Sequence, residues 1–226
     1  MEHYSDVLAR LHSMANPEAV AGMAKFKVGG QHTLGISMPN LRALAKEIGK
    51  NHKLALQLWS SGIHEARILA GLIDLPQEVT ESQMEQWALD FDSWDVCDQC
   101  CMNLFRKTPM AHQKAVAWSS RPEEFVKRAA FALMATLAVH DKKAGNDSFI
   151  PFLAVIQREA ADERNFVKKA VNWALRQIGK RNLSLNEAAI QTAREIQQLE
   201  SKSARWIAAD ALRELTSDKV RQRLKR

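Results

Sequence analysis

A short sequence that recurs along the chain constrains its fold more than any other feature. Phe125-Val126-Lys127-Arg128-Ala129 is followed forty-one residues later by Phe166-Val167-Lys168-Lys169-Ala170. A weaker copy is found at residues 204–208, and the Ala-Leu-Arg of residues 211–213 repeats that of residues 174–176 after thirty-seven positions. Each full copy opens an alanine-rich segment with helical spacing, so the sequence predicts stacked helical repeats.

The rest of the chain favours the same all-α class. No segment alternates apolar and polar residues over the length of a strand. Helices are expected over residues 2–14 and 17–26, and Ser37 and Thr80 are suited to cap two further helices. Proline stands close to the expected start of three later helices, at positions 109, 122 and 151. Because each repeat of about 40 to 47 residues holds a pair of helices, we expect an α-solenoid of HEAT-like repeats, forming a single domain over residues 1–226 with a short basic tail at 219–226.

Composition places the chain among ordinary globular proteins. Its 46% hydrophobic and 26% charged residues exclude a disordered chain, and no apolar run reaches the length of a membrane span. The acidic N-terminus is unlike a signal peptide, and the three cysteines lie within one predicted helix. We therefore expect a cytoplasmic protein with buried, inert thiols at Cys97, Cys100 and Cys101. The histidines form no metal-ligand spacing and no phosphate-cradling glycine loop is present, so we expect no metal and no cofactor.

Positive charge is concentrated in the C-terminal third. The net charge is +6, and residues 161–226 hold fifteen Lys and Arg against eight Asp and Glu. The tail at 219–226 supplies five of these cations. Such asymmetry favours an anionic partner, most often nucleic acid, although the tail could also serve only solubility.

One acidic residue stands out beside a tryptophan. Asp92 or Ser93 can cap a helix that runs to Thr108, and on it Trp94 and Asp98 share one face while Val96, Cys100 and Leu104 point another way. A carboxylate beside an indole can serve a reaction, whereas in most helices such a Trp belongs to the core and such an Asp is solvated.

Basic residues recur at the starts of successive predicted repeat helices. In a solenoid these positions would line one side of a concave face, and the alternative is that each cation merely solvates the surface. The residues are Lys127, Arg128, Lys168, Lys169 and Arg205.

Taken together, the Ser93–Asp98 segment, the two full repeat motifs and the Asn172-Trp173 that follows the second resemble the AlkD-like DNA alkylation repair glycosylases, a family of HEAT-like repeat proteins. The resemblance implies hydrolysis of the N-glycosidic bond of cationic N3- and N7-alkylpurines in duplex DNA. The family's catalytic Asp and its two tryptophans fall on Asp98, Trp94 and Trp173, and its basic residue near the lesion falls on Arg128. DNA contacts are expected at Arg128, Lys127, Lys168, Lys169, Arg176 and Arg205. Cys97 stands where Val is usual, which is a conservative departure. Phe26 and Ser37 replace polar residues that some members place near DNA, and these two departures put the lesion preference in doubt.

Two other functions fit the sequence. The first is a non-catalytic HEAT-repeat paralogue that binds damaged or branched DNA, although phosphate binding alone requires no carboxylate facing the DNA. The second is a protein-interaction scaffold, against which the recurrent cations speak. A monomeric, monofunctional glycosylase is the expectation, since no lysine is placed as an obvious Schiff-base nucleophile.

Overall fold

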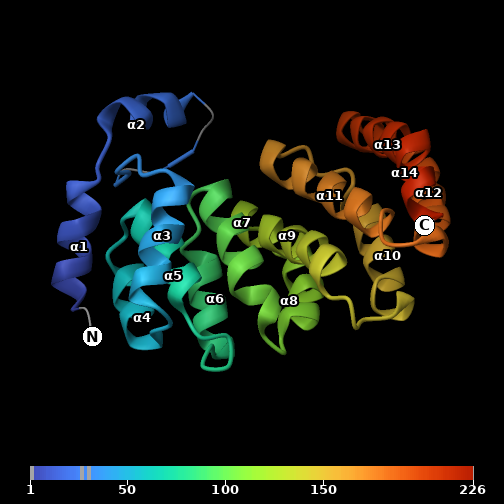
Figure 1. The fold of residues 1–226 in the computed structure, drawn as a ribbon. Coiled ribbons are helices and arrows are strands. Elements are labelled where there is room, and N and C mark those ends of the chain that lie inside the picture. The colour runs from blue at the N-terminus through green and yellow to red at the C-terminus, as the bar shows by residue number, and fades with distance from the viewer. Residues whose placement is uncertain (1–2, 26–27, 30–31, 226) are drawn as a thin grey trace. The chain divides into compact units, whose positions relative to one another are not determined.

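A computed structural model describes residues 3–25, 28–29 and 32–225, and within these residues every regular element is helical (Figure 1). The prediction of an all-α protein is confirmed. By its internal contacts the chain divides into two compact units, Met1–Thr108 and Pro109–Arg226. This division does not test the prediction of a single domain, which stays a prediction.

Seven α-helices and one short 3₁₀ helix form the described part of the first unit. They are α1 (Tyr4–Ser13), α2 (Pro17–Ala24), α3 (Met38–Ile48), α4 (His52–Ser60), α5 (His64–Ile73), α6 (Glu81–Leu89), α7 (Trp94–Asn103) and η1 (Phe105–Lys107). Helix α5 is central, because α3, α4 and α7 all pack against it. The indole of Trp59 on α4 stacks on that of Trp87 on α6 with ring centroids 3.9 Å apart. Burial of such large rings contributes strongly to a core.

Several helix starts of this unit follow the local signals in the sequence. Ser37 accepts a hydrogen bond from the Asn40 amide, and Thr80 accepts one from the Gln83 amide, as their capping roles predict. Helix α2 begins at Pro17 but ends at Ala24, and Phe26, where the prediction ended it, lies outside the described residues. The helix expected to reach Thr108 is divided, because α7 ends at Asn103 and the 3₁₀ turn η1 follows.

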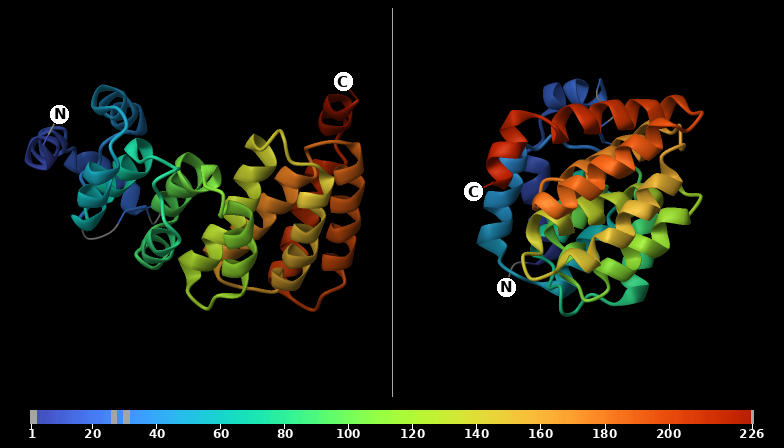
Figure 2. Two further views of the ribbon diagram at one scale, coloured as in Figure 1. Left: turned by 90° about the horizontal axis from the view of Figure 1, so that it is seen from below. Right: turned by 90° about the vertical axis from the view of Figure 1, so that its right-hand side faces the viewer.

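The second unit shows the repeat most clearly. Its elements are α8 (Ala111–Ala117), η2 (Trp118–Ser120), α9 (Glu124–His140), η3 (Asn146–Ser148), α10 (Ile150–Glu159), α11 (Asn165–Ile178), α12 (Leu183–Gln197), α13 (Lys202–Leu215) and α14 (Asp218–Leu224). Helix α11 packs between α9 and α13, while α10 packs on α12 (Figure 2). The phenyl rings of Phe125 and Phe166, which hold the same place in the two sequence repeats, lie 5.5 Å apart. Equivalent repeat positions are thus neighbours in space, as a solenoid requires.

Burial explains why alanine recurs in these helices. Residues 129–138 of α9 are almost completely buried, and the small side chains let α9 and α11 approach closely. The three cysteines are buried, as predicted, and none of them forms a disulfide with another described residue. Burial raises the pKa of the Cys100 thiol well above its usual value. None of the helices in the described part of the chain combines the length and apolarity needed to cross a membrane.

Candidate functional site

Helix α7 carries the predicted carboxylate and indole on its partly exposed side. Trp94 opens the helix and Asp98 lies one turn later, and both side chains are partly exposed. Val96, Cys97 and Cys100 are buried on the other side of the helix. The predicted division of this helix into two faces is therefore confirmed. A carboxylate held on a helix whose back is packed cannot move far, which suits a group that must act at a fixed place.

A chain of polar contacts between Gly29, Ser93, Asp95 and His64 holds the start of α7. Ser93 is the N-cap, but its hydroxyl accepts a hydrogen bond from the Gly29 amide at 3.3 Å and donates to Asp95 instead of capping the helix. The second carboxylate oxygen of Asp95 lies 2.8 Å from Nε2 of His64, at the start of α5. The buried ring of His64 thus ties α5 to the first turn of α7, directly beside Trp94.

Electrostatics favour the charged form of both partners in this contact. Burial lowers the pKa of His64, but the hydrogen bond and charge of Asp95, with the charges of Glu65 and Asp92, outweigh it and raise the pKa above its usual value. For Asp95, burial raises the pKa, and the hydrogen bonds from His64 and Ser93 outweigh it and lower the pKa. Nδ1 of His64 is buried without a hydrogen-bond partner. The pair is therefore an ion pair between the two pKa values.

Replacing His64 by Gln should remove a pH-dependent part of the stability. Because the pKa of His64 is higher in the folded than in the unfolded protein, protonation of His64 stabilises the fold. This stabilisation is complete below the pKa of the unfolded protein, near 6.5, and is lost as the pH rises through the pKa of the folded protein. The free energy of unfolding of the wild type should exceed that of His64→Gln by about 2 kcal/mol near pH 5.5, and the difference should be smaller above pH 7. Urea unfolding at several pH values measures this difference, and a difference that does not change with pH would contradict the ion pair.

A buried carboxylate, that of Glu65, anchors the segment that precedes α3. The carboxylate of Glu65 accepts hydrogen bonds from the amides of Leu34, Gly35 and Ile36 at 2.8, 2.7 and 3.3 Å. Gly35 has φ +78°, and a Cβ built there would lie 2.3 Å from the carbonyl oxygen of Asn16. Only glycine therefore fits this turn.

The two basic residues predicted at the start of α9 are buried. Lys127 is 9% exposed, and its ammonium lies 2.6 Å from Glu159 and 3.1 Å from Asp162. Arg128 is 6% exposed and donates to the carbonyl oxygen of Phe166 at 2.7 Å. In this structure both cations join neighbouring helices of the second unit.

The other predicted cations lie nearer to solvent, on α11 and α13. Lys169 and Arg205 are exposed, whereas Lys168 is partly exposed with its ammonium 5.5 Å from the centre of the Trp206 ring. Arg176 is held by Asp210 at 3.4 Å and Glu214 at 2.8 Å. On α11, positions 169, 173 and 176 fall on one side of the helix, so Trp173 lies between two cations.

The predicted site residues are distributed over both units. Trp94 and Asp98 belong to the first unit, and the six predicted cations and Trp173 belong to the second. Among the described residues no group of three or more His, Cys, Asp or Glu side chains is arranged to hold a metal ion.

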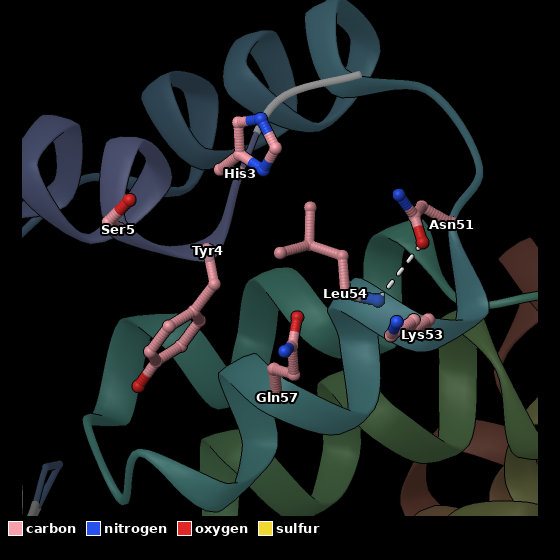
Figure 3. Close-up of a pocket in the computed structure, with 7 residues that line it drawn as sticks. All are labelled: His3, Tyr4, Ser5, Asn51, Lys53, Leu54 and Gln57. Atoms are coloured by element: carbon pink, nitrogen blue, oxygen red, sulfur yellow. Dashed lines mark hydrogen bonds between the residues drawn. The ribbon is translucent and has the colours of Figure 1, made fainter.

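A cavity of about 550 Å³ in the first unit contains none of the predicted site residues (Figure 3). It lies between α1 and α4, and its lining includes Tyr4, Lys53 and Gln57. Asn51 also lines it, but its side-chain oxygen already accepts the Leu54 amide and caps α4. These side chains offer no carboxylate for a reaction, so the cavity is not our candidate site.

Comparison with known families decides the assignment. The family described as DNA alkylation repair enzyme matches residues 7–215. The chain belongs to this DNA alkylation repair enzyme family. A comparison with curated proteins gave no match.

Solved structures confirm the fold of this DNA alkylation repair family member. One similar chain is described as "a new family of proteins related to the HEAT-like repeat DNA glycosylases with affinity for branched DNA structures"; it is 19% identical over 99% of this chain and 96% of that chain, with a TM-score of 0.82. At this identity the similarity shows the fold, and the predicted HEAT-like solenoid is confirmed. An engineered protein (16% identity, 78% of this chain, 90% of that chain, TM-score 0.40) and a designed armadillo repeat protein (17%, 78%, 92%, 0.37) are too dissimilar to add to this.

Two features of this DNA alkylation repair family member were missed from the sequence. The His64–Asp95 pair joins residues thirty-one positions apart, and nothing in the local pattern of either residue indicates the contact. Trp206 served in the sequence analysis only to mark a repeat, yet it is 41% exposed and lies against Lys168. Neither the exposure of Trp206 nor its contact with Lys168, thirty-eight positions earlier, can be read from the local sequence, so no sequence signal marked this residue.

Proposed function

We propose that this protein is a monomeric, monofunctional DNA glycosylase that hydrolyses the N-glycosidic bond of cationic N3- and N7-alkylpurines in duplex DNA. The observation that carries the proposal is the placement of Asp98 and Trp94 one turn apart on the partly exposed side of α7, in a member of the DNA alkylation repair enzyme family.

Chemistry explains why a single carboxylate suffices. A purine alkylated at N3 or N7 already carries a positive charge, so it leaves without the general acid that an ordinary glycoside requires. As the bond to C1′ breaks, positive charge develops on the deoxyribose. Ionised Asp98 would stabilise that charge and orient the attacking water, a contribution of about 3 kcal/mol when the group is fixed in advance.

Trp94 and Trp173 would hold the sugar and backbone through their ring faces, which also attract developing positive charge. Exposed cations on α11 and α13 would bind phosphate without regard to sequence. We assign this role first to Lys169 and Arg205, because both are exposed, and then to Lys168 and Arg176. The burial of Lys127 and Arg128 favours a structural role for these two, so a concave basic face, if it binds DNA, would depend on the exposed cations.

A second function is favoured by the fold similarity. The similar solved chain is described as having affinity for branched DNA, and a binding paralogue would need the basic residues but not Asp98. This alternative predicts tight binding to branched DNA and no release of base.

One experiment separates the two functions. Wild-type protein is incubated with duplex DNA containing N7-methylguanine, with the unmodified duplex and with a four-way junction. Release of free methylguanine without strand cleavage supports the monofunctional glycosylase. Salt-dependent binding to all three DNAs without release of base would instead establish the binding paralogue.

Lys127→Ala and Lys169→Ala remove the same charge, but the first should lower stability and the second should lower DNA affinity. Loss of the Lys127 ammonium leaves two largely buried carboxylates without it, so unfolding should become easier by about 2 kcal/mol while DNA affinity of the folded protein is kept. Lys169→Ala should leave the stability unchanged and weaken DNA binding several-fold. The negative slope of log K against log salt should become less steep by about 1. Thermal unfolding and fluorescence anisotropy measure the two effects. Equal losses of DNA affinity at unchanged stability would restore Lys127 to the DNA-binding set.

A further inference from the structure

A cavity in the second unit is lined by four cationic side chains. Its volume is about 250 Å³, and it lies where α9 and α11 end. The cationic lining residues are Lys142, Lys180, Arg181 and Arg223, and the remaining lining residues are Ala138, Val139, Gln177 and Asn182. Among the described residues no carboxylate lines the cavity. These cations come from three separate segments. Lys142 follows α9, Lys180 and Arg181 follow α11, and Arg223 lies on α14.

Arg181 is fixed in place before any ligand arrives. Its guanidinium donates to the carbonyl oxygens of Ala138 at 2.7 Å and Ala144 at 2.9 Å. It also lies over the ring of Phe149, 4.1 Å from the centroid. Burial lowers the pKa of Arg181, and the charge of Asp141 partly opposes this, but an arginine stays charged in proteins. A cation that is already ordered attracts an anion without the entropic cost of immobilising it.

Two carboxylates that interact with lining cations, Asp141 and Glu214, already have partners. Asp141 accepts hydrogen bonds from the amides of Lys143 and Ala144 and contacts His112. Glu214 contacts the ammonium of Lys180 at 2.7 Å. These contacts leave Lys142, Arg181 and Arg223 as the cations that an incoming anion would meet, and two of them, Lys142 and Arg223, are exposed.

Glu214 connects this cavity to the candidate DNA-binding side of α11. Its two carboxylate oxygens contact Lys180 and Arg176. Lys180 lies in the turn two residues after the end of α11, and its contact with Glu214, which Arg176 shares, brings it close to Arg176. The cavity therefore lies at the end of the row formed by Lys169, Trp173 and Arg176.

We propose that this cavity is a binding site for a backbone phosphate of DNA. Arginine and lysine together provide charge-assisted donors suited to phosphate oxygens, and the cavity is large enough for one such group. Its position at the end of the α11 row favours a phosphate within a DNA strand over a free small anion. The proposal rests on the DNA binding in the proposed function, but it requires no release of base.

Matched double variants test the site. Lys142→Gln with Arg223→Gln removes two lining cations, and Lys143→Gln with Arg221→Gln removes two exposed cations from the same two segments outside the lining. Both variants lose the same net charge. Binding of an unmodified duplex of about twenty base pairs is measured by anisotropy at several salt concentrations.

The lining variant should bind the duplex about tenfold more weakly than wild type, and its negative slope of log K against log salt should be less steep by about 1 to 2. The control variant should change the affinity less than threefold. Equal changes in the two variants would overturn the site. Thermal unfolding checks that both variants are folded. If inorganic phosphate at constant ionic strength stabilises wild type but not the lining variant while their DNA affinities agree, the site serves free anions and the DNA assignment is wrong.

Base-release measurements keep this proposal separate from the glycosylase proposal. If wild type releases no methylguanine but the lining variant still loses DNA affinity, the glycosylase fails and the phosphate site stands. If base is released while lining and control variants bind DNA alike, the phosphate site fails and the glycosylase stands.

Discussion

Asp98→Asn should lower the rate of base release from N7-methylguanine duplex at least about 100-fold and leave DNA binding nearly unchanged. Asparagine has the shape of aspartate without its charge, so it can still occupy the same place on α7 but can no longer stabilise positive charge on the deoxyribose. The rate is measured in single-turnover experiments with protein in excess, so that it reports the chemical step and not product release. Anisotropy with the same duplex measures binding.

Asp92→Asn is the matched control. Asp92 precedes α7, is exposed, and lies 3.4 Å from Arg67 in a contact that should contribute little to stability. The Asp92→Asn substitution removes the same charge as Asp98→Asn, six residues earlier in the sequence. A long-range effect of charge alone would therefore appear in both variants. A comparable fall in both rates, or a rate of Asp98→Asn within a few-fold of wild type, would remove Asp98 from the reaction.

The sequence was informative wherever the signal is periodic. The spacing of apolar residues around Trp94 and Asp98 is a property of one helix, and α7 has the two faces that this spacing predicts. The forty-one-residue repeat likewise predicted neighbouring helices, and the contact between Phe125 and Phe166 confirms it. Both inferences need only helical geometry.

The same reasoning could not tell a buried cation from an exposed one. Lys127 and Lys168 occupy equivalent repeat positions, yet the first is buried against Glu159 and Asp162 while the second lies against Trp206. The difference depends on which side chains the next helix presents, and in the sequence those residues are more than thirty positions away. Four cations that line one cavity from three segments are invisible in the sequence for the same reason.

Glu65→Ala should be among the most destabilising single substitutions in the first unit. Glu65 is 1% exposed and accepts hydrogen bonds from three consecutive backbone amides, at Leu34, Gly35 and Ile36. Removing the carboxylate leaves these donors without it, and buried donors of this kind cost about 1 to 3 kcal/mol each when unpaired. The position near the start of α5 adds a favourable interaction with the helix dipole, which is also lost.

The expected loss is at least about 3 kcal/mol, which corresponds to a fall in Tm of about 6 to 12 °C for a chain of this length. Glu65→Gln should fall between wild type and Glu65→Ala, because one side-chain oxygen is kept while the amide nitrogen faces a donor. Glu47→Ala is the matched control, since Glu47 is exposed and pairs only with Arg10 among the ion pairs of the described residues, and it should change Tm by less than about 2 °C. A fall in Tm for Glu65→Ala no larger than that of the control would show that the turn at residues 34–36 is held by packing alone. The expected large fall would show that a buried carboxylate, not the apolar core, fixes the segment leading into α3.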